Sequence, residues 1–275
     1  MEQNDVEFIH KIATSVAMPV KIKLSGNFPK NVNKRFRAFT KFYHIIHRNT
    51  EVKKYPIIIN NFNRLQWLQQ QVDWLQSVGQ NNIHIIDNGS TYEPLLKYYK
   101  TVPATVYLLD GNKGHEALWR THIFQRLGKY HYVYTDPDVL PDSNTPADFM
   151  YYFKDVLNRY PSIKKVGFGL KTDDLPAHYP KKEEVIRWEK QFYATAVEPA
   201  LYKSKIDTTF ALYQPGAAFQ CWNETLRTGA PHMLRHMPWY ENPMDLSEES
   251  SFYQQAASAS SSWYKSVKGD NEQYQ

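Results

Sequence analysis

The chain has 275 residues, which is enough for one large α/β domain or two small ones with a substantial hydrophobic core. Its single cysteine, Cys221, excludes an internal disulfide and fits a reducing compartment. The longest apolar runs are far shorter than a membrane span, and the polar, acidic N-terminus is unlike a secretory signal. We therefore expect a cytoplasmic protein.

The net charge of +5 is unevenly distributed along the chain. Residues 1–54 carry 11 Lys/Arg and 4 Asp/Glu, whereas the remaining residues carry 22 basic and 24 acidic side chains. The main domain is therefore close to neutral. This argues against a nucleic-acid-binding protein, whose basic residues would be spread over the whole domain.

Within the basic segment, four apolar residues recur at helical spacing: Phe36, Phe39, Tyr43 and Ile46. They predict an amphipathic helix, since basic residues lie between them. Two interpretations stay open. Residues 27–48 could make a peripheral contact with an anionic membrane, or the helix could pack on the main domain and leave its basic face in solvent.

From Tyr55 onwards, short apolar runs alternate with helical patterns. The runs that predict buried strands are 55–61, 83–87, 105–110 and 130–135. The helix after the first strand has an apolar stripe of Leu65, Leu68, Val72 and Leu75. We expect Asn63 to cap it and Gly79 to end it. Later helices are predicted over 93–100 and around Trp119, Ile123 and Leu127. This alternation predicts a parallel sheet with helices on both faces.

The second half of the chain is less regular. We predict a helix over 147–159, strands over 164–170 and 206–213, a helix over 182–193 between them, and a loop over 227–240. The predicted organisation is a basic N-terminal extension (1–54), an α/β domain (55–256) and a polar C-terminal tail (257–275).

Polar side chains follow each predicted strand of the first half. They are Asn60 and Asn61, then Asp87, Asp110, and finally Asp136 with Asp138. Because ligands bind at the carboxyl ends of parallel strands, these residues should line one binding rim.

The last of these positions, "TDPD", places two carboxylates on either side of Pro137. A turn at the proline would let both acids face one ligand, and their hard oxygens suit Mg²⁺ or Mn²⁺. The structural alternative is a turn in which Asp136 bonds its own backbone. A bare D-x-D is weak, but its place at a strand end favours the metal site.

Five stretches together resemble the GT-A glycosyltransferases, and family 2-like members in particular. They are "PIIINNFNR" (56–64), "IIDNGST" (85–91), "NKGHEALW" (112–119), "YTDPDVLP" (134–141) and "RHMPWY" (235–240). The resemblance covers roughly residues 55–245. It implies a Rossmann-like, mostly parallel sheet flanked by helices, with the D-x-D motif after the fourth strand. It also implies a metal-dependent transfer from a nucleoside diphosphate sugar.

The resemblance assigns roles to individual residues. Those expected to contact the nucleotide are Asn61, Asn63, Arg64, Asp87, Asp110, Asn112 and Gly114, with Asp87 accepting a hydrogen bond from the base, plausibly uracil. Asp136 would touch the ribose or the metal, and Asp138 would ligate the metal directly. A late histidine often completes such sites; His236 is the first candidate here and His232 the second. Arg235 would neutralise phosphate charge.

The residue that would deprotonate the acceptor hydroxyl is less clear, because the Glu-Asp pair common at a late helix of the family is not evident. Candidates are Asp173, Asp174 and Asp207. Candidate platforms for stacking a sugar are Trp119, Trp188, Trp222 and Trp239, although core packing is the alternative for each.

The sequence therefore predicts a hexosyltransferase type of enzyme that uses Mn²⁺ or Mg²⁺ and a nucleotide sugar, with UDP favoured. A glycan or lipid-linked acceptor is expected, as in polysaccharide synthesis. Two other classes stay open. One is a non-catalytic protein that binds nucleotide sugars or carbohydrates on the same fold. The other is a D-x-D phosphatase, with Asp136 as nucleophile and Asp138 as acid, although that motif usually follows the first strand.

Overall fold

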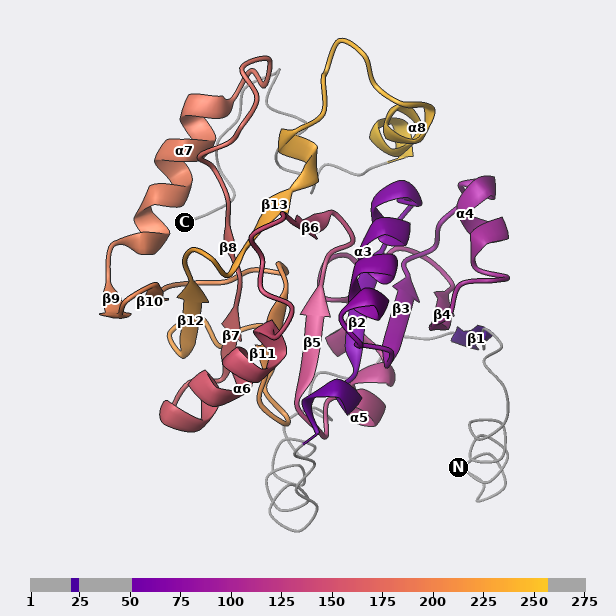
Figure 1. Ribbon diagram of the computed structural model, residues 1–275. Helices are drawn as coiled ribbons and strands as arrows, with labels where there is room; N and C mark the ends of the chain where they lie inside the picture. The colour runs from indigo at the N-terminus through magenta and orange to yellow at the C-terminus, as the bar shows by residue number, and fades with distance from the viewer. Residues whose placement is uncertain (1–20, 25–50, 257–275) are drawn as a thin grey trace, which may run out of the picture.

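The computed structural model describes residues 21–24 and 51–256 of the chain, and the structural statements below concern these residues. They form an α/β fold around a large mixed sheet, partly parallel, that is flanked by helices (Figure 1). The strand order is β1-β4-β3-β2-β5-β11-β7-β12-β10-β9. Nine of the ten strands lie within 51–256, and β1 (Lys21–Leu24) pairs with β4 at the edge.

The first half of the sheet is parallel, as the sequence predicts. Its strands are β2 (Ile57–Asn61), β3 (Ile83–Asp87), β4 (Thr105–Leu109) and β5 (Tyr132–Thr135). The connecting helices are α3 (Gln66–Ser77), α4 (Glu93–Tyr98) and α5 (Ile123–Leu127). Strands β3 and β4 lie on one side of β2, and β5 lies on the other. This reversal makes the carboxyl ends of β2 and β5 a topological switch point, where open α/β sheets bind ligands.

The second half makes the sheet mixed. Its strands are β7 (Lys165–Gly167), β9 (Ala196–Glu198), β10 (Leu201–Lys203), β11 (Ala211–Tyr213) and β12 (Thr225–Thr228). Strand β11 runs antiparallel to both of its neighbours, β5 and β7. The helices of this half are α6 (Phe149–Arg159), α7 (Lys182–Lys190) and α8 (Glu248–Ala256).

A second, three-stranded sheet lies at the carboxyl end of β5. It consists of β6 (Val139–Pro141), β13 (Met233–His236) and β8 (Gly169–Leu170), in that order from β6 to β8 with β13 central. Two predictions are corrected here. The predicted loop 227–240 contains β13, and the predicted strand 164–170 is divided between β7 and β8, which belong to different sheets. The predicted strand 206–213 is limited to β11.

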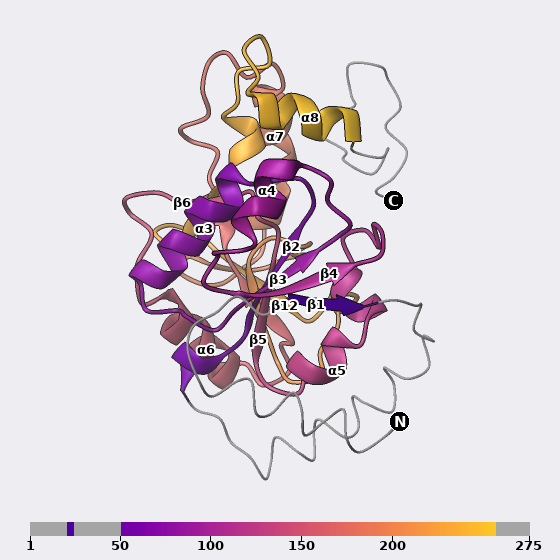
Figure 2. The same cartoon turned by 90° about the vertical axis from the view of Figure 1, so that its right-hand side faces the viewer.

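Helices cover both faces of the main sheet. One apolar cluster joins the sheet to α3 and α6, and a second cluster joins it to α5. Figure 2 shows α3 and α6 on one side of the strands and α5 on the other. The apolar stripe predicted for α3 is confirmed for Leu68, Val72 and Leu75, which are fully buried, whereas Leu65 precedes the helix and is half-buried. The helix expected around Trp119 is instead a 3₁₀ turn, Ala117–Arg120, followed by α5.

The prediction that Asn63 caps α3 is wrong. Helix α3 has no side-chain cap. Asn63 has a positive φ of 52°, and its Oδ1 accepts hydrogen bonds from the backbone N–H groups of Thr91 and Tyr92, at 2.8 and 3.0 Å. Asn63 therefore caps the start of α4, a long-range role that local sequence does not reveal.

The predicted basic helix and the membrane contact through 27–48 lie outside the described residues, as does the tail 257–275. Among the residues that are described, no helix combines the length and apolar composition needed to cross a bilayer.

Candidate functional site

The D-x-D turn lies at the switch point between β2 and β5. Asp136 directly follows β5, and Asp138 directly precedes β6. At the upper end of the strands in Figure 1, the turn is flanked by β6, β13 and helix α3. The strand-end position expected from the sequence is therefore confirmed.

Asp136 is held by the loop before β11. Its N–H donates to the carbonyl of Thr208 at 3.0 Å, and its carboxylate accepts a hydrogen bond from the Thr208 hydroxyl. Burial raises the pKa of Asp136 well above its ordinary value, and the neighbouring carboxylates of Asp138 and Asp207 raise it further. A carboxyl group in this state is a good partner for a hydroxyl and a poor nucleophile.

Asp138 lies opposite His236. Strands β6 and β13 are antiparallel with Val139 facing His236 in register, and the N–H of Met237 donates to the Asp138 carbonyl at 2.8 Å. This pairing brings Asp138 Oδ2 to 3.7 Å from His236 Nε2. Two positions 98 residues apart in sequence thus meet at the end of a small sheet.

The surroundings of His236 favour the neutral form of its imidazole ring. Burial lowers its pKa, although Asp138 and Asp207 act in the opposite direction. Its ring packs edge-on against Trp239 with centroids 4.7 Å apart. Its Nδ1 is buried and has no hydrogen-bond partner among the described residues. A neutral ring is the form that binds metals.

The donor set fits part of a divalent metal site. Two ligands of one ion, each about 2.1 Å from it, lie roughly 3–4 Å apart, which the Asp138–His236 separation satisfies. Within residues 21–24 and 51–256, no three His, Cys, Asp or Glu side chains gather into a complete protein site. Such a pair suits Mg²⁺ or Mn²⁺, which typically use one or two carboxylates and take further ligands from water or substrate phosphate.

The loops after β2 and β3 are tied together by a buried network. Tyr99 donates to Asp87 Oδ1 at 3.0 Å and accepts from Asn61 Nδ2 at 2.8 Å, while Ser90 N–H donates to Asp87 Oδ2 at 3.1 Å. Burial raises the pKa of Asp87, against these hydrogen bonds. Both Asp87 oxygens are therefore engaged within the protein, so the expected contact to a base would have to share one of them.

Arg64 lies under α8 and is almost fully buried. Its guanidinium is sandwiched between the rings of Trp67 and Tyr253, at 4.2 and 3.7 Å, and donates to the Ser250 hydroxyl at 3.0 Å. Glu249 of the same helix accepts the Gln66 N–H at the start of α3. Arg64 thus anchors α8 over the loop where the sequence places the nucleotide.

The loop after β4 is joined to the first two strands. Gly114 carbonyl accepts hydrogen bonds from Asn60 Nδ2 at 3.3 Å and Asn88 Nδ2 at 2.9 Å. Gly114 has a positive φ of 77°, and its N–H donates to Asn112 Oδ1 at 2.7 Å. Asp110 forms an ion pair with Lys113. The residues expected at the nucleotide and sugar pocket are therefore gathered at one edge.

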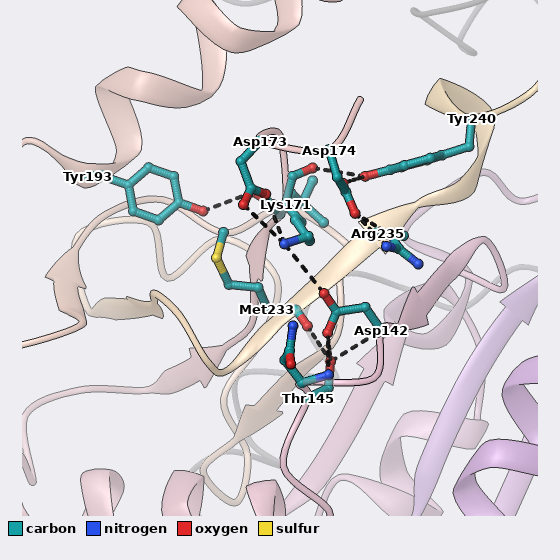
Figure 3. A network of polar contacts seen from close by, with 11 residues as sticks. Asp142, Thr145, Lys171, Asp173, Asp174, Tyr193, Met233, Arg235 and Tyr240 are labelled. Carbon is teal, nitrogen blue, oxygen red and sulfur yellow. Dashed lines mark hydrogen bonds and ion pairs between the residues drawn. The ribbon is translucent and has the colours of Figure 1, made fainter. Parts of the chain in front are cut away.

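Two of the predicted acceptor-site acids, Asp173 and Asp174, lie in a separate polar network with Lys171, Arg235 and Tyr240 (Figure 3). Asp174 accepts hydrogen bonds from Arg235 Nε at 2.8 Å and from the Tyr240 hydroxyl. Burial alone would raise the pKa of Asp174, but these two donors hold it below its ordinary value. Asp173 is exposed and paired with Lys171 at 2.9 Å. Arg235 is thus engaged by Asp174, which competes with its expected role at a phosphate.

Asp207 is the predicted acid that stays with the D-x-D turn. It is exposed, and its Oδ1 accepts the Thr209 N–H at 3.0 Å, so only one oxygen is used. The loop is supported from below by the buried Lys165, whose ammonium donates to the Ile206 carbonyl at 2.6 Å.

The remaining candidates are the four tryptophans, which differ in burial, and His232. Trp119 and Trp239 are buried, and Trp222 is half-buried, whereas Trp188 is the exposed one of the four. His232 stacks on Tyr152 of α6 with centroids 4.2 Å apart. Of the two candidate histidines, only His236 is paired with the D-x-D turn.

Four contributors are absent from the sequence prediction. They are Gln71, Thr208 and the α8 residues Glu249 and Ser250. The buried position of Gln71 on the apolar side of α3 is the one signal that a helical pattern could have supplied.

Comparison with known proteins identifies no family. No protein-family model matches this chain. No curated protein matches it either.

Proposed function

We propose that this protein is a metal-dependent glycosyltransferase that moves a sugar from a nucleoside diphosphate sugar, with UDP favoured, to an acceptor hydroxyl. The observation that carries the proposal is the pairing of Asp138 with a neutral His236 at the switch point of the sheet. A divalent ion bound there would neutralise the departing diphosphate.

The chain order supports a GT-A type of domain. Within 51–256, the D-x-D turn follows the fourth strand. Asn61 and Asp87 are the last residues of the first two strands, and Asp110 directly follows the third. The loops after these strands are hydrogen-bonded to one another, which gives the nucleotide a preformed edge to bind. The buried oxygens of Asn60 and Asn61 have no hydrogen-bond partner among the described residues and suit contacts to a ligand.

Each acid of the D-x-D turn then has a separate task. Asp138 and His236 would hold the ion, and Asp136 would bond a ribose hydroxyl, because its carboxylate already accepts a hydrogen bond from the Thr208 hydroxyl. The position of the motif after the fourth strand, and not the first, disfavours the phosphatase alternative.

Asp207 is the proposed acceptor base. It is exposed beside the D-x-D turn and has one oxygen without a partner among the described residues. Asp174 is less suited, because Arg235 and Tyr240 already occupy it and hold its pKa low, which weakens its basicity. A carboxylate base predicts inversion at the anomeric carbon.

The proposal is tested by incubating the protein with a panel of nucleotide sugars and Mn²⁺ and following nucleoside diphosphate release. We expect slow hydrolysis of one donor, abolished by EDTA and reduced at least about a hundredfold in Asp138→Asn. The matched control is Asp155→Asn, an exposed acid on α6 at the opposite end of the strands (Figure 1).

The other outcomes identify the alternatives. Donor binding without turnover, with varied acceptors, would indicate a non-catalytic nucleotide-sugar or carbohydrate-binding protein. Phosphate release from simple phosphomonoesters would indicate the phosphatase. A glycan or lipid-linked acceptor stays a prediction of the sequence, as do the cytoplasmic location and the membrane contact through 27–48. Liposome binding that disappears on deletion of residues 1–54 would support that contact.

A further inference from the structure

The D-x-D turn is held from beneath by a buried amide of α3. Gln71 Nε2 donates to two carbonyls of the turn, those of Asp136 at 3.0 Å and Val139 at 2.9 Å. These carbonyls are three residues apart and enclose Pro137 and Asp138. One amino group therefore closes the turn into a ring, using both of its protons.

The rest of the turn is tied by two other elements. The Asp136 N–H donates a hydrogen bond to the Thr208 carbonyl in the loop before β11, and the Asp138 carbonyl accepts one from the Met237 N–H after β13. Pro137 has no N–H to satisfy. Gln71 is thus the contact that joins the two ends of the turn to each other and to the body of the domain.

Folding stability alone does not explain a glutamine at this position. Gln71 is fully buried on the helix face that also carries Leu68, Val72 and Leu75. Its Oε1 is buried and has no hydrogen-bond partner among the described residues. The amide thus supplies a donor to two carbonyls of the turn, at the cost of burying its own oxygen without a partner among the described residues. A local conflict of this kind is expected where a residue serves a site.

We propose that Gln71 is a positioning residue for the metal pair, an inference that rests on the proposed function. By fixing the carbonyls on both sides of Asp138, it sets the direction in which the Asp138 carboxylate leaves the turn. The carboxylate consequently faces His236 Nε2, 3.7 Å away. Residues that orient a metal ligand typically change metal affinity about 10- to 100-fold when they are replaced.

The test compares Gln71→Met with the wild type. Methionine keeps the length and volume of the side chain but cannot donate. The matched control is Gln70→Met, the same replacement one residue earlier on the exposed face of α3. Mn²⁺ affinity is measured by calorimetry, and the Mn²⁺ electron paramagnetic resonance spectrum is recorded, each with and without UDP. Urea unfolding of all three proteins separates lost stability from lost positioning.

We expect Gln71→Met to weaken Mn²⁺ binding about 10- to 100-fold and to change the spectrum, while Gln70→Met changes neither. Gln71→Met should also unfold at a lower urea concentration, because two carbonyls lose their donor, but it should be fully folded under the conditions of the binding assay. Gln71→Asn keeps the amide but is one methylene shorter, so its nitrogen no longer reaches both carbonyls. It should weaken binding in the same direction and covers the case in which the methionine variant does not fold. Equal Mn²⁺ affinity in wild type and both Gln71 variants would overturn the inference alone. A wild type that binds no Mn²⁺, with or without UDP, would overturn the proposed function and this inference together.

Discussion

Replacement of Glu189 by glutamine should make the protein more stable above pH 7 and should remove part of its pH dependence. Glu189 of α7 pairs with Arg227 of β12 at 2.6 Å, and both residues are at most 4% exposed. Burial raises the pKa of Glu189 from 4.5 to about 7, although Arg227 opposes this shift. The cost of removing the charge from water thus exceeds the attraction within the pair.

The sign follows from proton uptake. Between pH 4.5 and about 7, the folded protein keeps the Glu189 proton that the unfolded chain has lost. Stability from this group is therefore complete below pH 4.5 and is lost as the pH rises through about 7. At about 1.4 kcal/mol per unit of pKa, the total loss is up to about 3 kcal/mol.

Urea unfolding at pH 5, 6, 7 and 8 measures the effect as a difference between variants, so that other titrating groups cancel. Glu189→Gln should match the wild type near pH 5 and exceed it at pH 8 by up to about 3 kcal/mol. Glu189→Ala, which leaves Arg227 buried without a partner, should lose about 3–5 kcal/mol. Glu183→Gln, an exposed change on the same helix, is the control. A Glu189→Gln variant that is less stable than wild type at pH 8 would refute the reasoning.

Three further predictions concern the scaffold around the site. Asn63→Ala should lower the unfolding free energy by about 1–3 kcal/mol, because it removes the acceptor for two N–H groups at the start of α4. Urea unfolding measures this loss. Asn63→Gly should lower the unfolding free energy by less, since glycine adopts the φ of 52° without strain. Tyr253→Ala removes one ring from Arg64 and should speed limited proteolysis of α8 by about tenfold; an unchanged cleavage rate would contradict the anchoring role. Burial lowers the pKa of Lys165 from 10.5 to about 8, so above pH 8 the folded protein has lost a proton that the unfolded chain keeps. The contribution of Lys165 to the unfolding free energy should therefore grow from pH 8 towards pH 10. Urea unfolding across that range should show this growth in wild type but not in Lys165→Met.

The parallel half of the fold follows from the sequence because its signals are local. Each of β2, β3 and β5 is a continuous buried run, and the stripe of α3 has a helical period. The segment 227–240 could not be read in this way. Strand β13 owes its existence to pairing with β6 and β8, which lie more than 60 residues away in sequence. Taken alone, the His, Arg and Pro content of the segment 227–240 favours a loop.

Part of the candidate site could likewise be predicted from the sequence, and part of it could not. Sequence alone predicted that acids and amides lie at the carboxyl ends of parallel strands, and the positions of Asp136 and Asp138 at the end of β5 agree with this. The proximity of His236 was an expectation, and the pairing of β6 with β13 now supplies a reason for it. The choice among the acids needed the tertiary structure, because only there do Arg235 and Tyr240 engage Asp174 while Asp207 stays exposed.

What the tertiary structure decided throughout is the identity of the partners. Asn63 caps α4 and not α3, and Gln71 supports a turn 65 residues further along the chain. A hydrogen bond has a direction and a range of about 3 Å, so it depends on where distant segments meet in space. Hydrophobic periodicity depends only on neighbouring residues. The sequence therefore determines the strands and the polar residues at their carboxyl ends, but not the hydrogen bonds that shape the candidate site.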